Sequence, residues 1–277
     1  MPNPMPAPME KLIRGTGLKG RADAEGKSSF CEFFALVKKG HPECGDSAFV
    51  YSDKDMFIAA VLDGVSGEPG ASFASSDAAK AILEHLKGVK EPGESAIKEA
   101  LTRAHLAIRI GSTTATIFHM SKDGSFIVAS IGDSPAYGID TDGKISLELN
   151  PSRAVKDDDS ILKYFHYRNL VTSVLGSQTE LEVCMRSGTL KKGQAVILAS
   201  DGISDNLFVH VKEGYVTDSS GTKDLADIIG KLRSPRAIVE KLLETVGKRI
   251  SGGNAEEPGR MLVPKEDDIA VIAVRRI

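Results

Sequence analysis

Apolar residues gather in short runs that alternate with polar, glycine-containing turns, a pattern typical of β-strands. The run Met56–Leu62 is apolar throughout, which indicates a strand that is buried on both faces. The strands predicted in this way are Phe30–Val37, Ala48–Ser52, Met56–Leu62, Thr113–His119, Phe126–Ile131, Ala136–Ile139, Gln194–Ala199 and Ile269–Val274.

A helical period replaces this pattern in four segments. Apolar side chains recur at helical spacing in residues 70–88 and 94–110, and again after the pair Ser234 and Pro235, which resembles a helix start. A short helix is predicted over Ile161–Phe165. Groups of strands thus alternate with helices, and single strands do not alternate with single helices. This order favours an α+β fold of antiparallel sheets flanked by helices over a doubly wound parallel sheet.

Composition and charge narrow the class of protein. The chain has 277 residues, 41% of them hydrophobic, which suits one large domain or two small ones. The net charge of −3, with acids and bases interspersed, lacks the basic cluster that nucleic-acid binding needs, so no nucleic-acid partner is expected. The cysteines, Cys31, Cys44 and Cys184, are odd in number and form no CxxC pair. They therefore predict neither a disulfide framework nor a zinc site, and indicate a reducing compartment.

The first residues lack the signals of export or membrane insertion. The segment MPNPMPAPMEKLIRG contains four prolines, which block a helix, and has no apolar core of a signal peptide. Residues 1–28 are therefore predicted to be a flexible proline-rich arm, and residues 29–277 a single domain. No apolar run approaches the ~20 residues of a membrane span, so we expect no membrane partner and a cytoplasmic location.

Four aspartates stand at the edges of apolar strands. They are Asp63, Asp133, Asp201 and Asp267, and the first three adjoin a glycine that would let the backbone turn and leave room for an ion. Any one of these pairs alone is better explained as an ordinary turn. Together they would bring carboxylates into mutual repulsion unless a cation lies between them. Mn²⁺ or Mg²⁺ is expected, because both prefer oxygen ligands.

Five segments resemble the motif series of a known family. VLDGVSG, GSTTATIF, ASIGDSPAYG, VILASDGISD and EDDIAVIAV follow one another as in the PPM family of metal-dependent serine/threonine phosphatases, also called protein phosphatase 2C. The resemblance covers residues 30–277. It implies an α-β-β-α sandwich of two antiparallel sheets, with metals at one end between the sheets. It also implies a phosphorylated protein substrate and a counterpart serine/threonine kinase.

The resemblance assigns roles to individual residues. By its pattern Asp63 bridges two metals, and Asp63 and Asp201 are catalytic residues. His41, at the position of a phosphate-binding residue of the family, is taken as the third. Two or three ions are implied, and a hydroxide that bridges them would attack phosphorus directly. The implied metal ligands are Asp46, Asp63, Gly64, Asp133, Asp201, Asp205 and Asp267, with Asp133 and Asp205 serving a third, weaker site.

The chain also departs from the family pattern. His41 stands where the family has an arginine that grips the substrate phosphate, and Gly45 replaces an acidic or amide residue beside Asp46. His41 is either a weaker phosphate ligand or an exposed turn residue, and Lys38 or Lys39 could supply the missing charge. These departures motivate an alternative, a catalytically weak sensor or binding domain. A two-metal phosphodiesterase is a third reading, which the absence of a basic face disfavours.

Overall fold

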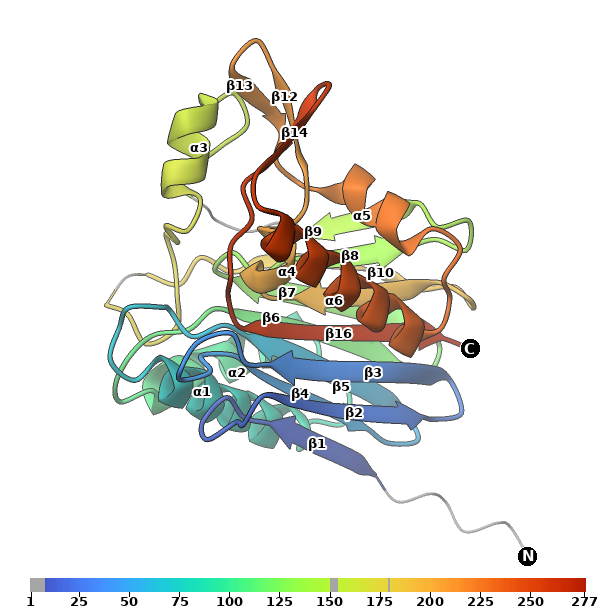
Figure 1. The fold of residues 1–277 in the computed structure, drawn as a ribbon. Helices are drawn as coiled ribbons and strands as arrows, with labels where there is room; N and C mark the ends of the chain where they lie inside the picture. The colour runs from blue at the N-terminus through green and yellow to red at the C-terminus, as the bar shows by residue number, and fades with distance from the viewer. Residues whose placement is uncertain (1–7, 150–153, 179) are drawn as a thin grey trace, which may run out of the picture.

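Two six-stranded sheets pack face to face and helices cover their outer faces (Figure 1). The computed structural model describes residues 8–149, 154–178 and 180–277. Every strand pairing within the two sheets is antiparallel. The predicted α-β-β-α sandwich is confirmed.

The first sheet has the strand order β1-β4-β5-β6-β7-β10. Helices α1 (Ala71–Leu86) and α2 (Glu94–Ala107) pack on its outer face through an apolar cluster that includes Ile82 and Leu101. Its strands are β1 (Met9–Ile13), β4 (Ser47–Ser52), β5 (Met56–Leu62), β6 (Ala115–Ser121), β7 (Ser125–Ile131) and β10 (Cys184–Thr189).

The second sheet has the strand order β2-β3-β16-β11-β8-β9, so the last strand of the chain lies in its interior. Helices α4 (Asp201–Ser204), α5 (Thr222–Ile229) and α6 (Pro235–Gly252) contribute to the cluster on its outer face. Its strands are β2 (Arg21–Lys27), β3 (Cys31–Lys38), β8 (Ala136–Ile139), β9 (Ile145–Leu149), β11 (Ala195–Ala199) and β16 (Ile269–Arg276).

A smaller unit projects beyond the sandwich (Figure 1). It consists of helix α3 (Ile161–Tyr167) and a four-stranded sheet of order β13-β12-β15-β14, with a core of its own around Tyr164 and Val216. Its strands are β12 (Val209–Lys212), β13 (Tyr215–Asp218), β14 (Ala255–Glu257) and β15 (Arg260–Leu262).

The prediction of a flexible arm over residues 1–28 is wrong for most of that segment. β1 pairs with β4 and β2 pairs with β3, so each extends one edge of a sheet. Met9 and Ile13 pack against the core between the sheets, which offsets the cost of ordering this edge. Residues 1–7 lie outside the described part of the chain.

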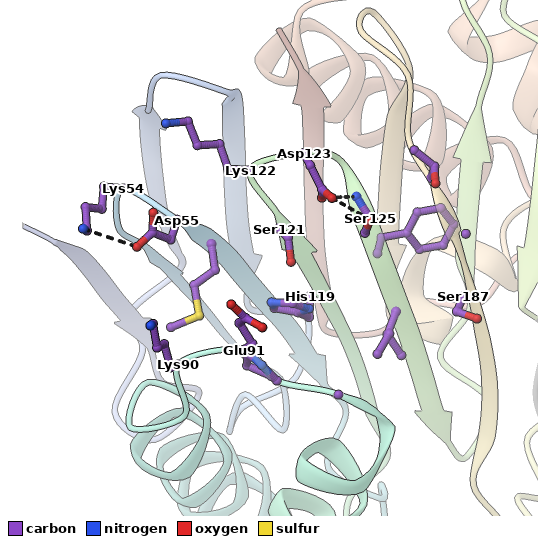
Figure 2. Close-up of a pocket in the computed structure, with 17 residues that line it drawn as sticks. Lys54, Asp55, Lys90, Glu91, His119, Ser121, Lys122, Asp123, Ser125 and Ser187 are labelled. Atoms are coloured by element: carbon purple, nitrogen blue, oxygen red, sulfur yellow. Dashed lines mark hydrogen bonds and ion pairs between the residues drawn. The ribbon is translucent and has the colours of Figure 1, made fainter.

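One buried histidine makes the stability of the fold depend on pH. His119, on β6, is 4% exposed, and its Nε2 has no hydrogen-bond partner among the described residues. It lies in a surface pocket between the end of the first sheet and the loop before α2 (Figure 2). Burial lowers the pKa of His119 from 6.5 to about 4.

We therefore expect acid to destabilise the protein partly through His119. The unfolded chain binds this proton near pH 6.5 and the folded chain only near pH 4, so stability is lost as the pH falls across that window. The contribution is about 3 kcal/mol at most. Urea denaturation at pH 7 and pH 5 should show a smaller loss in His119→Gln than in the wild type. The exposed control His166→Gln should lose as much as the wild type, and equal losses in all three proteins would contradict the assignment.

Candidate metal centre

Strand register places the predicted carboxylates at one end of the sandwich. In the first sheet Ser47 pairs with Leu62 and Ala115 with Ile131. Asp46, Asp63 and Asp133 therefore lie just beyond the strands, at the same end of the sheet. In the second sheet Ala199 pairs with Val271, so Asp201 and Asp267 lie just beyond neighbouring strands at one end of that sheet.

Ser200 connects the two sheets at this end through hydrogen bonds. Ser200 Oγ donates to Asp46 Oδ2 at 2.7 Å and accepts from the N–H of Ala270 at 2.9 Å. Asp46 belongs to the first sheet, whereas Ser200 and Ala270 belong to the second. The carboxylates that precede β4 and follow β5 therefore face those that follow β11 and precede β16.

The five carboxylates lie close enough to oppose one another's ionisation. Burial, followed by the charges of Asp201, Asp46, Asp133 and Asp267, raises the pKa of Asp63 well above its usual value. Burial likewise raises the pKa of Asp46, although the hydrogen bond from Ser200 acts against it. This cluster gains stability from any positive charge placed among its members.

The glycines beside these aspartates serve two different purposes. Gly132 has φ 93°, a left-handed conformation that glycine adopts freely, so the GD pair is a sharp turn. A side chain at Gly64 would collide with the carbonyl oxygens of Ala71 and Gly45. The backbone of Ala71 and Gly45 thus approaches Gly64 too closely for any side chain, so this position requires glycine for local packing.

A lysine that the sequence reading did not single out lies among the carboxylates. Lys265 Nζ is 2.6 Å from Asp201 Oδ2 and 2.6 Å from Asp267 Oδ2. Burial alone would lower the pKa of the Lys265 ammonium, but the charges of Asp201, Asp205 and Asp267 raise it above its usual value. Burial and Asp201 raise the pKa of Asp267 to about 6 even though Lys265 opposes this.

The Lys265 ammonium occupies a position at which the oxygens of Asp201 and Asp267 could hold a metal cation. Two carboxylate oxygens, one from the aspartate after β11 and one from the aspartate before β16, converge on one point charge. Both are hard oxygen donors of the kind that Mg²⁺ and Mn²⁺ prefer. One histidine, His41, also lies close enough to Asp267 and Asp268 to share an ion with them.

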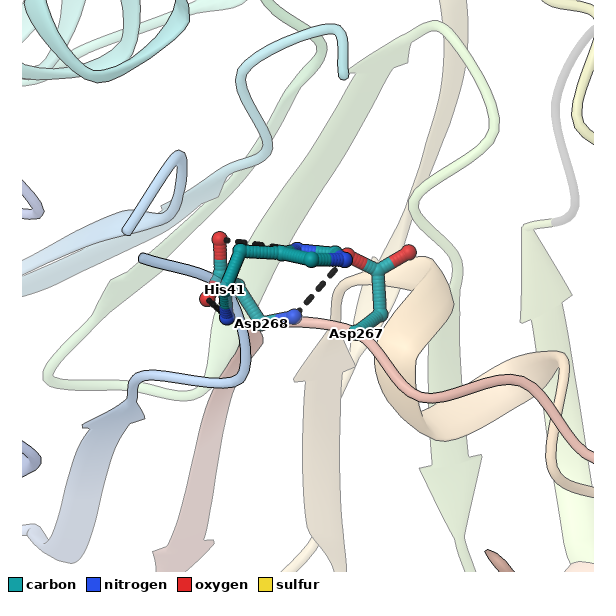
Figure 3. Close-up of side chains that lie close together, drawn as sticks. All are labelled: His41, Asp267 and Asp268. Carbon is teal, nitrogen blue, oxygen red and sulfur yellow. Dashed lines mark hydrogen bonds and ion pairs between the residues drawn. The ribbon is translucent and has the colours of Figure 1, made fainter. Parts of the chain in front are cut away.

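His41 lies beside the last two aspartates (Figure 3). Its Nδ1 is 3.2 Å from Asp267 Oδ1 and 3.6 Å from Asp268 Oδ2, and its side chain is 41% exposed. Asp268 itself accepts three backbone N–H groups, from Gly40 at 2.6 Å, His41 at 3.0 Å and Gly45 at 2.7 Å. Asp268 therefore fixes the loop that carries His41 and leads into Asp46.

Replacing Asp268 with asparagine is expected to loosen that loop. An asparagine offers one acceptor oxygen where the carboxylate uses two, so at least one buried N–H loses its partner. We expect a loss of about 2 kcal/mol in the free energy of unfolding, measured by urea denaturation. The exposed control Asp55→Asn should change it by less than about 0.5 kcal/mol. A stable Asp268→Asn protein would show that the loop is held by other contacts.

Asp205 faces an arginine of the projecting unit. Arg168 Nε is 3.6 Å from Asp205 Oδ2, and both side chains are buried. The guanidinium also donates to the carbonyl oxygens of Asp205 at 3.1 Å and Val263 at 2.7 Å. Asp205, which is expected at the third metal site, therefore lies beside the buried guanidinium of Arg168, the residue at the C-terminal end of α3.

Comparison with known proteins decides the family. The family model described as protein phosphatase 2C matches residues 37–242. The chain belongs to the protein phosphatase 2C family. The predicted enzyme class, a protein serine/threonine phosphatase, is confirmed with it.

Named relatives of this phosphatase are distant. It is 26% identical over 271 residues to the mitochondrial protein phosphatase 2C homolog 7 of Saccharomyces cerevisiae, covering 84% of this chain and 74% of the relative. It is 23% identical to the probable protein phosphatase 2C 1 of Oryza sativa, covering 83% and 70%.

Solved structures of phosphatases share its fold. The serine/threonine phosphatase of S. agalactiae superposes with a TM-score of 0.62 at 16% identity, covering 88% of this chain and 99% of the other. RsbX, solved in complex with magnesium, superposes with a TM-score of 0.60 at 16% identity, covering 92% and 100%. Within the described residues of this phosphatase, no helix has the length and apolar character needed to cross a bilayer.

Proposed function

We propose that this phosphatase hydrolyses phosphoserine and phosphothreonine in proteins with two divalent cations held by its strand-edge aspartates. The observation that carries the proposal is the convergence of Asp201 and Asp267 on a single cation position, next to Asp63 and Asp46. Bound Mn²⁺ or Mg²⁺ would make water a nucleophile at neutral pH and offset charge on the phosphoryl oxygens. A counterpart kinase and a cytoplasmic location stay predictions.

The proposed ligands divide between the two sheets. Asp63 and Asp46 would hold the cations from the first sheet, with the Gly64 carbonyl as a further donor, and Asp201 and Asp267 would hold them from the second. Asp133 and Asp205 would serve a third ion, although Arg168 already lies beside Asp205. Ser200 would keep Asp46 in place, because its hydroxyl donates to that carboxylate.

A cleft next to the aspartates provides a place for the substrate. It has a volume of about 300 Å³, and its lining includes His41, Glu43, Gly45, Gly64 and Asp268. A phosphorylated side chain in this cleft would reach the carboxylate cluster with His41 at the rim. The cleft is thus placed to present a phosphate monoester to the cations.

Replacing His41 with arginine is expected to lower KM for a phosphopeptide. A guanidinium is always charged and binds phosphate with two parallel hydrogen bonds, which a partly exposed imidazole does not. Steady-state kinetics on a phosphothreonine peptide should give a lower KM with little change in kcat. The variant His41→Gln should raise KM if the imidazole contacts phosphate. An unchanged KM in both variants would place His41 outside the phosphate site.

Hydrolysis assays test the proposed function directly. Para-nitrophenyl phosphate and a phosphothreonine peptide are each incubated with Mn²⁺, with Mg²⁺ and with EDTA, and Asp201→Asn serves as the inactive control. We expect turnover with either metal, none with EDTA, and none in the variant. A folded wild-type protein without turnover under any condition would favour the sensor or binding domain, and a preference for a phosphodiester would favour a phosphodiesterase.

A further inference from the structure

Lys265 lies at the point where the two second-sheet ligands meet. Its ammonium is 2.6 Å from one carboxylate oxygen of Asp201 and 2.6 Å from one of Asp267. Both oxygens belong to proposed ligands of the same divalent cation. A position enclosed by these two oxygens can hold the ammonium or a divalent cation, but not both, because two positive charges at that separation repel strongly.

The lysine is fastened at its backbone to the turn that carries Asp201. Asn206 is fully buried, and its Oδ1 accepts from the N–H of Lys265 at 3.0 Å. Its Nδ2 donates to the Lys265 carbonyl at 2.9 Å and to the Gly202 carbonyl at 3.0 Å. The ammonium can therefore swing on its four-carbon stem, but its backbone stays beside the two carboxylates.

The second carboxylate oxygen of Asp267 also has partners. Asp267 Oδ1 lies 3.2 Å from His41 Nδ1 and accepts the N–H of Asp268 at 2.8 Å, while Oδ2 faces Lys265. Both oxygens of Asp267 thus have partners within the protein. The ligand is preorganised, and Lys265 supplies the positive charge that the arrangement needs.

We propose that Lys265 is a tethered resident cation that divalent metals must displace from Asp201 and Asp267. The inference rests on the metal-dependent function proposed above and names the residue that sets the metal affinity of this site. In the metal-free protein the ammonium holds the two ligands together. A divalent cation held by Asp201 and Asp267 would displace the ammonium from their oxygens.

Two opposite effects should follow from removing the ammonium. A tethered group competes at a high effective concentration, so its loss should tighten divalent cation binding by about tenfold or more. The same change leaves two neighbouring carboxylates without a counter-charge, so the metal-free protein should melt at a lower temperature. A lysine with a merely structural surface role would produce neither tighter metal binding nor this opposition.

The experiment is a calorimetric titration of the full-length, metal-free chain with MnCl₂, with melting curves in EDTA. Lys265→Met is compared with the wild type, with Lys38→Met as a control for general charge and with Asp201→Asn as a control for the site. Lys38 ends β3 near the same edge and forms no ion pair with Asp201 or Asp267 among the described contacts. Lys265→Gln replaces the methionine variant if that protein does not fold.

We expect Lys265→Met to bind Mn²⁺ about tenfold or more tightly than the wild type and to melt at a lower temperature in EDTA. Lys38→Met should match the wild type within about twofold, because screened surface charges contribute little. Equal or weaker Mn²⁺ binding in Lys265→Met, with binding lost in Asp201→Asn, would overturn the role of Lys265 and leave the metal site intact. An absence of Mn²⁺ binding in every protein would overturn the metal-dependent function as well.

Discussion

Replacing Asp63 with asparagine should reduce kcat for a phosphothreonine peptide by at least about a thousandfold. The substitution keeps the size of the side chain but removes the charge at the centre of the cluster, where Asp201, Asp46, Asp133 and Asp267 all act on it. Cations contribute several kcal/mol of transition-state stabilisation in such sites, and about 4 kcal/mol corresponds to a thousandfold in rate. Steady-state kinetics with saturating Mn²⁺ measures the effect.

The fold should survive this change, since Asp63 is anchored through its backbone. Its N–H donates to Thr114 Oγ1 at 3.2 Å and its carbonyl accepts from the N–H of Thr114 at 2.8 Å. Removing a carboxylate from a crowded cluster should leave the melting temperature in EDTA unchanged or raise it. The exposed control Asp142→Asn should keep the wild-type rate. An Asp63→Asn enzyme with more than a tenth of the wild-type rate would place the catalytic centre elsewhere.

Replacing Phe57 with alanine should lower the free energy of unfolding by about 3–5 kcal/mol. Phe57 is fully buried between the two sheets, with its ring centroid 5.4 Å from that of Phe33 and 6.5 Å from that of Phe118. Phe33 belongs to the second sheet and Phe118 to the first, so the ring fills the space in which the sheets meet. The deletion leaves a cavity that the rigid strands around it cannot close.

A matched phenylalanine separates this packing effect from the loss of side-chain area in general. Phe73, on α1, is 50% exposed, and Phe73→Ala should change the free energy of unfolding by less than about 1 kcal/mol. Urea denaturation of both variants gives the comparison. Similar losses at the two positions would mean that the sheets tolerate a cavity at their interface.

The interior of the fold was predictable because burial leaves a strong signal. The continuous run Met56–Leu62 and the predicted strand Ala136–Ile139 coincide with β5 and β8 residue for residue. Edge strands carry a weaker signal, because one side faces solvent and mixed residues suffice. β2 reads RADAEGK and was taken for part of a flexible arm, yet its pairing with β3 makes it a strand.

The aspartates of the predicted site could be found from the sequence, but the residues that hold them and the neighbouring loop in place could not. Aspartates at strand ends can be recognised from one segment each. Lys265 and Asp268 act through contacts more than 60 and 220 residues away along the chain, with Asp201 and with the loop at Gly40–Gly45. The segment KEDD gives no sign of these distant partners by itself. The roles given to the aspartates stay predictions until the variants are measured.

The position of β16 bears on when the enzyme can first become active during its synthesis. This strand lies between β3 and β11, and Asp267 stands two residues before it. The second sheet is therefore complete only when this last strand has been added. A growing polypeptide that still holds this segment in the ribosome lacks the strand that connects β3 to β11, and it lacks Asp267, one of the proposed ligands. If Asp267 holds a cation as proposed, we expect no metal-dependent hydrolysis by the nascent chain before this strand inserts.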